Sequence, residues 1–340
     1  MPKQLNLLWL QSGGCGGCTM SLLNAEQPNV FDAFKNSHIN ILWHASLSAN
    51  PSNDFTQVVN DITSDKVQLD ILCVEGAAVT GPDGTGGFHM VSGMDIPMMT
   101  LIEQLAQKSQ YTLAIGSCTA YGGMTRSNKN QTDVKGLQYI AEQKGGLLGS
   151  DYLSKSDMPV INIAGCPAHP EWILHTIQAI ALDKFDANEI DTVQRPKFYT
   201  EHLAHHACPK NEYYEYKASA AKPGQAGCLM ENLGCKATQA AADCNIRLWN
   251  GHGSCPKAGY ACINCTAPGF EEPGHAFCRT PKLAGIPIGL PTDMPKAWFI
   301  ALSSLSKAAT PERIKTNARS ETIKISPDMA KNKGNAKTKK

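Results

Sequence analysis

This 340-residue chain contains thirteen cysteines, and their thiols are its main candidates for reactive or metal-binding groups. Four follow apolar segments at glycine-rich turns: Cys15, Cys18, Cys118 and Cys166. Four thiolates around one point suit either a tetrahedral zinc ion or a 4Fe-4S cluster. A lone Cys-x-x-Cys is also typical of a thioredoxin-like dithiol or half of a zinc site, and four unrelated buried cysteines are the plainest alternative. The metal hypothesis therefore depends on what brings the four together.

The elements that must position these cysteines form an alternating pattern over residues 1–190. Short apolar runs bounded by glycine and polar residues are separated by helix-like segments, and they cover residues 5–10, 39–42, 69–74, 111–115 and 160–164. This pattern predicts an α/β domain with a doubly wound, flavodoxin-like parallel sheet. Because parallel strands end at one edge, the four thiols should converge there. Glu75 follows the third run, so it could transfer protons at that edge or simply cap a helix.

The stretch over residues 191–285 is different, because cysteine, glycine, histidine and proline are frequent and no apolar period is sustained. Such a segment usually needs bound metal to fold. Its first candidate set is His205, Cys208, Cys228 and Cys235, and His206 competes with His205. One histidine and three cysteines fit an iron-sulfur cluster, with structural zinc as the alternative.

A further set of four thiols follows in the same stretch: Cys244, Cys255, Cys262 and Cys265. Alone it could be a zinc ribbon. Three four-ligand sets in one chain favour a series of redox centres over three structural zinc ions. Two cysteines are left over: we expect Cys73 to pack as a small apolar side chain in its strand, and Cys278 has no assignment.

Composition narrows the class of protein further. The formal net charge is +1, so the chain as a whole lacks the excess of basic residues that is typical of nucleic-acid binding. No apolar run reaches the roughly 20 residues that a membrane span needs. The sequence begins with a strand-like segment, so we expect no export signal and a cytoplasmic protein, where thiols stay reduced and bind metal more often than they form disulfides.

Residues 286–340 end in a basic stretch, expected to be partly disordered and either a docking element or a solubilising terminus.

Taken together, the motifs resemble the small subunit of nickel-iron hydrogenases from about residue 5 to residue 279. The resemblance rests on segments that include Cys15-Gly-Gly-Cys18, Val74-Glu75-Gly-Ala, Gly116-Ser-Cys118, Gly165-Cys166-Pro and Cys262-Ile-Asn-Cys265. It implies a proximal 4Fe-4S cluster on the first cysteine set and a distal 4Fe-4S cluster on the His205 set, whose cysteine spacing is one residue longer than usual. It also implies a medial cluster on the Cys244 set. Many family members have 3Fe-4S there because proline replaces one thiol, but Cys255 implies 4Fe-4S here.

The resemblance also implies partners and a role. An obligate large subunit would contain the nickel-iron centre, so no residue of this chain is the primary catalyst of hydrogen oxidation. The Thr19-Met-Ser-Leu-Leu segment and residues 285–298 are most similar to the hydrogen-sensing, regulatory branch. Members of that branch form dimers of heterodimers and signal to a histidine kinase. The alternatives are a cytoplasmic uptake hydrogenase that supplies a metabolic acceptor and, from another class, a zinc-stabilised interaction module.

Overall fold

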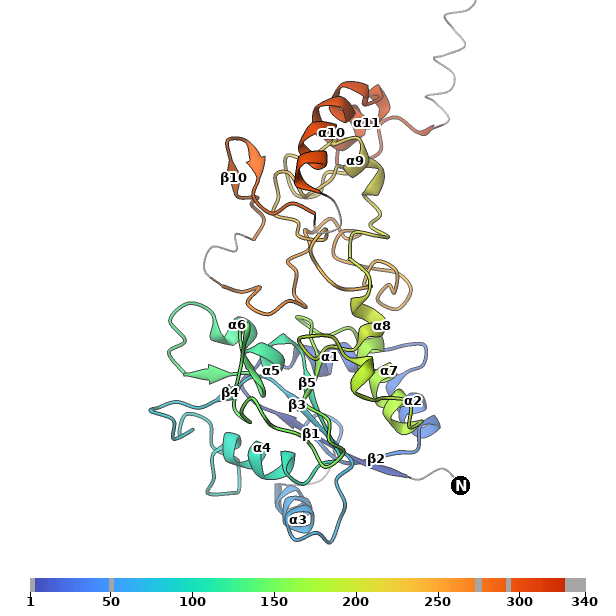
Figure 1. Ribbon diagram of the computed structural model, residues 1–340. Coiled ribbons are helices and arrows are strands. Elements are labelled where there is room, and N and C mark those ends of the chain that lie inside the picture. The colour runs from blue at the N-terminus through green and yellow to red at the C-terminus, as the bar shows by residue number, and fades with distance from the viewer. Residues whose placement is uncertain (1–3, 49–51, 273–276, 292–294, 328–340) are drawn as a thin grey trace, which may run out of the picture. The chain divides into compact units, whose positions relative to one another are not determined.

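The computed structural model describes residues 4–48, 52–272, 277–291 and 295–327 (Figure 1). The chain divides into two compact units. The first comprises Met1–Thr200 and Cys265–Pro273, and the second comprises Glu201–Asn264 and Gly274–Lys340. This division differs from the boundaries expected at residues 190 and 285. A short segment from within the cysteine-rich stretch, Cys265–Pro273, groups with the first unit, and the C-terminal residues group with the second.

A five-stranded parallel sheet forms the centre of the first unit and confirms the predicted α/β fold. Its strand order is β2-β1-β3-β5-β9, and the strands are β1 (Leu5–Gln11), β2 (Ile39–His44), β3 (Ile71–Glu75), β5 (Tyr111–Ile115) and β9 (Ile161–Ile163). The order reverses beside β1, as in flavodoxin-like sheets, where sites form beyond the carboxyl ends of the strands. Each expected apolar run overlaps one of these strands.

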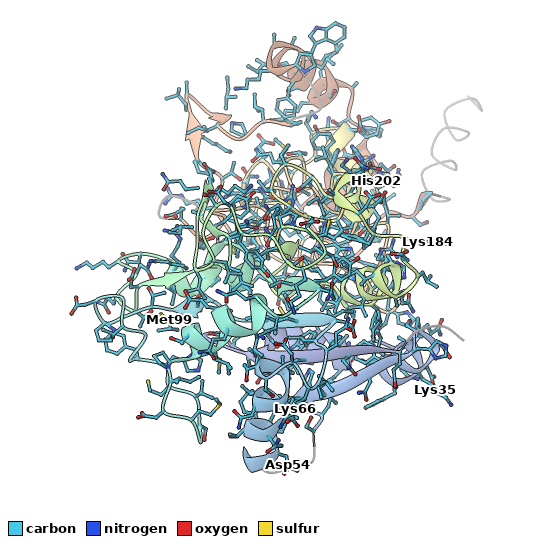
Figure 2. The ribbon with its side chains drawn as sticks, turned by 60° about the horizontal axis from the view of Figure 1, so that its bottom comes forward. Lys35, Asp54, Lys66, Met99, Lys184 and His202 are labelled. Carbon is cyan, nitrogen blue, oxygen red and sulfur yellow. The ribbon has the colours of Figure 1, made fainter. Side chains whose placement is uncertain are left out.

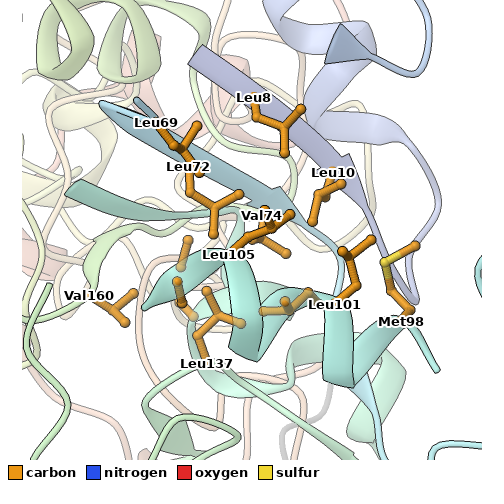
Figure 3. Close-up of a cluster of buried hydrophobic side chains, with 14 of the residues drawn as sticks. Leu8, Leu10, Leu69, Leu72, Val74, Met98, Leu101, Leu105, Leu137 and Val160 are labelled. Carbon is orange, nitrogen blue, oxygen red and sulfur yellow. The ribbon is translucent and has the colours of Figure 1, made fainter. Parts of the chain in front are cut away.

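Both faces of the sheet are buried, which explains why its strands are apolar at nearly every position. Helices α3 (Ser52–Thr63) and α4 (Met98–Ala106) contribute to a core on one face, together with alternate residues of the strands. Figure 3 shows Leu8 and Leu10 of β1, Leu72 and Val74 of β3, and Leu101 and Leu105 of α4 in this cluster. Helices α1 (Gly17–Leu23), α2 (Val30–Asn36) and α7 (Pro170–Ala181) pack against one another in the same unit.

Short elements complete the first unit: β4 (Ala78–Val79), α5 (Ser117–Tyr121), α6 (Gly123–Arg126), β6 (Val134–Lys135), β7 (Tyr139–Ile140), β8 (Gln143–Lys144), the 3-10 turn η1 (Ala187–Glu189) and α8 (Lys197–Thr200). Charged side chains such as Lys35, Lys66 and Lys184 are exposed and are labelled in Figure 2. Among the described residues, no helix is long and apolar enough to cross a membrane.

The second unit has little regular structure around its cysteines, as its sequence indicated. Its elements are α9 (Asn211–Glu215), the β10 (Lys282–Leu283) and β11 (Ile286–Pro287) hairpin, α10 (Lys296–Ala309) and α11 (Glu312–Ala318). The apolar clusters are small, and they are formed by Tyr213, Ala218, Ile314 and Ala318 and by Tyr214, Met230 and Phe299. Within the C-terminal extension, residues 286–340, which was expected to be partly disordered, α10 and α11 are helical, and residues 328–340 lie outside the described residues.

Candidate metal centres

Four thiols meet in one cavity of the first unit. Cys15 lies in the loop after β1, Cys18 in the first turn of α1, Cys118 in α5 directly after β5, and Cys166 in the loop after β9. All four line the same cavity at the carboxyl ends of these strands. The predicted proximal set is thus gathered at one place by elements that are far apart in the sequence.

Glycines allow these thiols to approach one another. A Cβ atom on Gly116 would lie 2.5 Å from Sγ of Cys18, and one on Gly17 would lie 3.1 Å from Sγ of Cys15. Gly116 also has a φ of 86°, which favours glycine. A larger residue at position 116 would occupy the space of the Cys18 thiol, so glycine at this position is needed for the thiol to keep its place in the cavity.

The electrostatics of this cavity suit a bound cation. Burial raises the pKa values of the Cys18, Cys118 and Cys166 thiols, and neighbouring acidic groups raise them further; the pKa of Cys166 rises to about 12. Free thiols here would therefore stay protonated at neutral pH. A metal group removes that penalty, because its positive charge stabilises the thiolates that bind it.

Glu75 lies at the edge of this cavity with a buried carboxylate. Its Oε1 accepts hydrogen bonds from the backbone N–H of Cys18 (2.9 Å) and of Thr19 (3.0 Å). Its Oε2 accepts from Trp9 Nε1 at 3.2 Å and from the hydroxyl of Thr19. The carboxylate thus stabilises the start of α1, which is the capping alternative considered from the sequence, and the proton-transfer hypothesis has to be tested against that role.

The predicted distal set lines a second cavity, which lies wholly within the second unit. His205, Cys208, Cys228 and Cys235 all contribute to its wall. The His205 ring packs against Tyr214, with ring centroids 4.2 Å apart. Nδ1 of the competing His206 instead accepts a hydrogen bond from the backbone N–H of Leu203 at 3.3 Å. This geometry favours His205 as the ligand.

Lys210 is a residue of this cavity that the sequence analysis missed. Its Nζ donates hydrogen bonds to the backbone oxygens of Gln225 and Ala226, both at 2.9 Å. Burial lowers the pKa of Lys210, and the surrounding cysteines oppose that shift. The side chain is thus a fixed cation beside the thiols. Its position two residues after Cys208 was the only sequence signal.

The four cysteines of the predicted medial set belong to different units of the chain. Cys244, Cys255 and Cys262 belong to the second unit, and Cys265 opens the segment that belongs to the first. Within the second unit, the carbonyl of Cys262 accepts a 2.8 Å hydrogen bond from the backbone N–H of Lys236, next to Cys235. Pro256, the neighbour of Cys255, lines the cavity of the His205 set. Cys255 and Cys262 therefore lie close to the distal set.

Among the residues that the structure describes, no group of three His, Cys, Asp or Glu side chains is placed to bind a single metal ion. Of the remaining cysteines, Cys73 is fully buried in β3, as expected, and Cys278 is exposed.

Comparisons with known proteins agree with this geometry. The family described as NADH ubiquinone oxidoreductase, 20 Kd subunit, matches residues 15–180, and the family described as the C-terminal part of the NiFe/NiFeSe hydrogenase small subunit matches residues 199–278. The F420 non-reducing hydrogenase II small subunit of Methanosarcina mazei is 35% identical over 291 residues, which cover 79% of this chain and 74% of that relative. The periplasmic NiFeSe hydrogenase small subunit of Desulfomicrobium baculatum is 29% identical, and the match covers 81% of this chain and 87% of that relative.

Solved structures of hydrogenases are also similar to this chain. The NiFeSe hydrogenase of Desulfomicrobium baculatum matches with a TM-score of 0.67 and 28% identity over 79% of this chain and 96% of that one. An actinobacterial-type NiFe-hydrogenase from Ralstonia eutropha H16 has a TM-score of 0.72 over 92% and 93% of the two chains, and at 23% identity it supports the fold alone.

The first unit is a doubly wound sheet with thiols at its strand ends, and the second unit is irregular and rich in cysteine. Together they define an electron-transfer subunit. The chain belongs to the small-subunit family of nickel-iron hydrogenases. It is the electron-relay partner of a large subunit in a heterodimer. The names of the matched relatives include F420 non-reducing and periplasmic enzymes. They do not single out a regulatory branch.

Proposed function

We propose that this chain relays electrons through three iron-sulfur clusters and that its hydrogenase acts as a hydrogen sensor. The convergence of four thiols from three strand ends in one cavity is the observation that carries the relay. Bound clusters would supply one-electron redox centres, whose potentials depend on ligands, burial and hydrogen bonds. The role of the chain is to fix the thiolates and to shield them from water.

The proposed ligands are those of the three sets. The proximal ligands are Cys15, Cys18, Cys118 and Cys166; the distal ligands are His205, Cys208, Cys228 and Cys235; and the medial ligands are Cys244, Cys255, Cys262 and Cys265. With four protein ligands in each set, we propose 4Fe-4S at all three. The nickel-iron centre belongs to the large subunit.

Metal analysis of the purified heterodimer tests the relay. We expect about twelve cluster irons with matching sulfide, as three four-iron clusters require, and nickel contributed by the large subunit. Electron paramagnetic resonance of the hydrogen-reduced heterodimer should show the clusters as separate signals. A colourless preparation with stoichiometric zinc would support the zinc-stabilised interaction module instead.

The sensing role rests on two segments that are similar to the regulatory branch, Thr19–Leu23 and residues 285–298. In the structure, Met20 of the first segment is 70% exposed and Trp298 of the second is 66% exposed, so both present apolar side chains that a partner could cover. We assign to this role a cytoplasmic location, a dimer of heterodimers and a histidine kinase as the receiving partner.

Hydrogen-dependent gene expression tests the sensing role. Deletion of the chain should abolish the induction of other hydrogenases by hydrogen, while the purified heterodimer turns over slowly with dyes. The heterodimer should run at twice its mass in solution and fractionate with cytoplasmic markers. Rapid turnover together with unchanged gene expression would favour the uptake hydrogenase, a catalytic role like that of the relatives named as hydrogenases.

A further inference from the structure

The segment Cys265–Pro273 is built into the first unit by side chains of that unit. Nη1 of Arg195 donates a 2.8 Å hydrogen bond to the backbone oxygen of Thr266, and Arg126 forms an ion pair with the buried Glu271 at 3.4 Å. Phe270 is completely buried. The segment therefore has a defined place in the unit that contains the proximal cysteines.

One further contact fixes the segment at its first residue. The hydroxyl of Ser117 donates a hydrogen bond to the backbone oxygen of Cys265. The same oxygen atom of Ser117 accepts a 2.9 Å hydrogen bond from the backbone N–H of Gly165. Ser117 is 1% exposed, and its hydroxyl donates one hydrogen bond and accepts another within the protein.

The sequence neighbours of these groups are proposed cluster ligands. Ser117 precedes Cys118 and Gly165 precedes Cys166, so both belong to loops of the proximal set, whereas Cys265 is itself a proposed medial ligand. Cys265 also lies close enough to Cys166 to raise the pKa of that thiol. A single hydroxyl thus contacts three segments that each supply a ligand.

We infer that Ser117 is a positioning residue that holds the last medial ligand, Cys265, in a fixed place relative to the proximal cysteines. The inference rests on the proposed ligand sets. Its hydroxyl acts through the backbone oxygen of Cys265 and the backbone N–H of Gly165. Its effect is on the geometry and mobility of the Cys265 end of the medial site, and so on the properties of the cluster bound there.

Ser117→Ala isolates this role. The backbone N–H of Ser117 would still donate its 2.9 Å hydrogen bond to the oxygen of Gly165, so the loops of the proximal set keep a direct connection. The substitution instead leaves the N–H of Gly165 and the oxygen of Cys265 without the hydroxyl between them. Loss of these two hydrogen bonds is unfavourable, so the Cys265 end should become more mobile.

Ser109→Ala is a matched control. Ser109 is also a fully buried serine of the first unit, with hydrogen bonds to Ala106 (3.1 Å) and Thr112 (2.8 Å). Neither partner belongs to a cysteine loop. The control therefore removes a hydroxyl that is equally buried and hydrogen-bonded, but that contacts no segment with a proposed ligand. Ser117→Thr is the rescue variant, because it keeps a hydroxyl at position 117.

The experiment uses the intact heterodimer and two measurements on the medial cluster. Redox titration followed by electron paramagnetic resonance should show a shifted midpoint potential of the medial signal in Ser117→Ala, with the wild-type value in Ser109→Ala and Ser117→Thr. Loss of one iron from the medial cluster to a chelator should be about tenfold faster in Ser117→Ala, the factor that corresponds to about 1.4 kcal/mol.

The wild-type heterodimer tests the ligand sets, and the variants test the role of Ser117. If the wild-type heterodimer has no third cluster signal, the proposed ligand sets are wrong. If that signal is present but Ser117→Ala and Ser109→Ala behave alike in both measurements, the ligand sets stand and the role inferred for Ser117 is overturned.

Discussion

The backbone N–H of Cys18 donates a 2.9 Å hydrogen bond to Oε1 of Glu75, which lies 57 positions later in the chain. Helix α1 begins after Gly16, which has no side chain to cap the free N–H groups of the first turn. A carboxylate from the end of β3 supplies that cap. The position of a proposed cluster ligand thus depends on the packing of two neighbouring strands.

Replacement of Glu75 by glutamine tests the capping role against proton transfer. An amide offers one acceptor oxygen where the carboxylate offers two, so a buried donor among Trp9 and Thr19 loses its partner. We expect a loss of about 1–3 kcal/mol in stability and an altered proximal cluster signal. Thermal unfolding and electron paramagnetic resonance of the heterodimer measure both.

The exposed Glu189→Gln should leave both measurements unchanged. If Glu75→Gln lowered proton exchange with hydrogen gas while stability and the proximal signal stayed as in the wild type, Glu75 would be a proton carrier and the cap would be secondary.

Gly116→Ala should prevent assembly of the proximal cluster. The added methyl group would stand 2.5 Å from Sγ of Cys18, and neither the thiol nor the helix can withdraw far in a buried site. We expect about four fewer irons per heterodimer, as the loss of one four-iron cluster requires. Iron and sulfide analysis gives the answer.

Gly84→Ala is the control for backbone strain. Gly84 has a similar positive φ of 75°, but a Cβ there would meet no atom within 4 Å. Gly84→Ala therefore tests a positive φ without crowding, whereas Gly116 also has a ψ of 159°, a backbone conformation that is essentially restricted to glycine. Equal iron contents in the two variants would contradict a specific effect on Cys18.

Lys210→Met should lower the midpoint potential of the distal cluster. Reduction adds negative charge to the cluster, and the fixed ammonium group beside Cys208 and Cys228 favours it. A charge interaction of about 1 kcal/mol corresponds to a shift of tens of millivolts for one electron. Redox titration of the distal signal measures this shift, and the exposed Lys222→Met should give the wild-type value.

His205→Ala and His206→Ala should separate the two candidate histidines. We expect the distal cluster signal to be lost or changed only in the first variant, because His205 lines the cavity and His206 bonds to the backbone of Leu203. Spectroscopy of both heterodimers is sufficient. An intact distal signal in His205→Ala, with a changed one in His206→Ala, would reverse the assignment.

The sequence was informative where the chain follows simple periodic rules. Apolar runs buried on both faces predicted the sheet, and the shared edge of parallel strands predicted that Cys15, Cys118 and Cys166 would meet. Helix α10 was missed because the C-terminal region was assessed by its charge, although its apolar residues, such as Phe299, pack against Tyr214 and Met230.

Contacts between distant segments could not be predicted in this way. The serine at position 117 is one of many small polar residues near a turn, and its role depends on where Gly165 and Cys265 lie in the folded chain. The same holds for Glu75, whose donors come from β1 and α1, and for Lys210, whose acceptors are backbone oxygens that no sequence pattern marks.

The return of Cys265–Pro273 to the first unit has a consequence for biosynthesis. Residues 1–200 leave the ribosome well before the segment that contributes Phe270 and Glu271 to their interior. The first unit can reach its final packing only after residues 265–272 have also been synthesised. Until then Arg126 lacks its partner Glu271 and the interior lacks Phe270, so the unit that contains the proximal cysteines is completed late in translation.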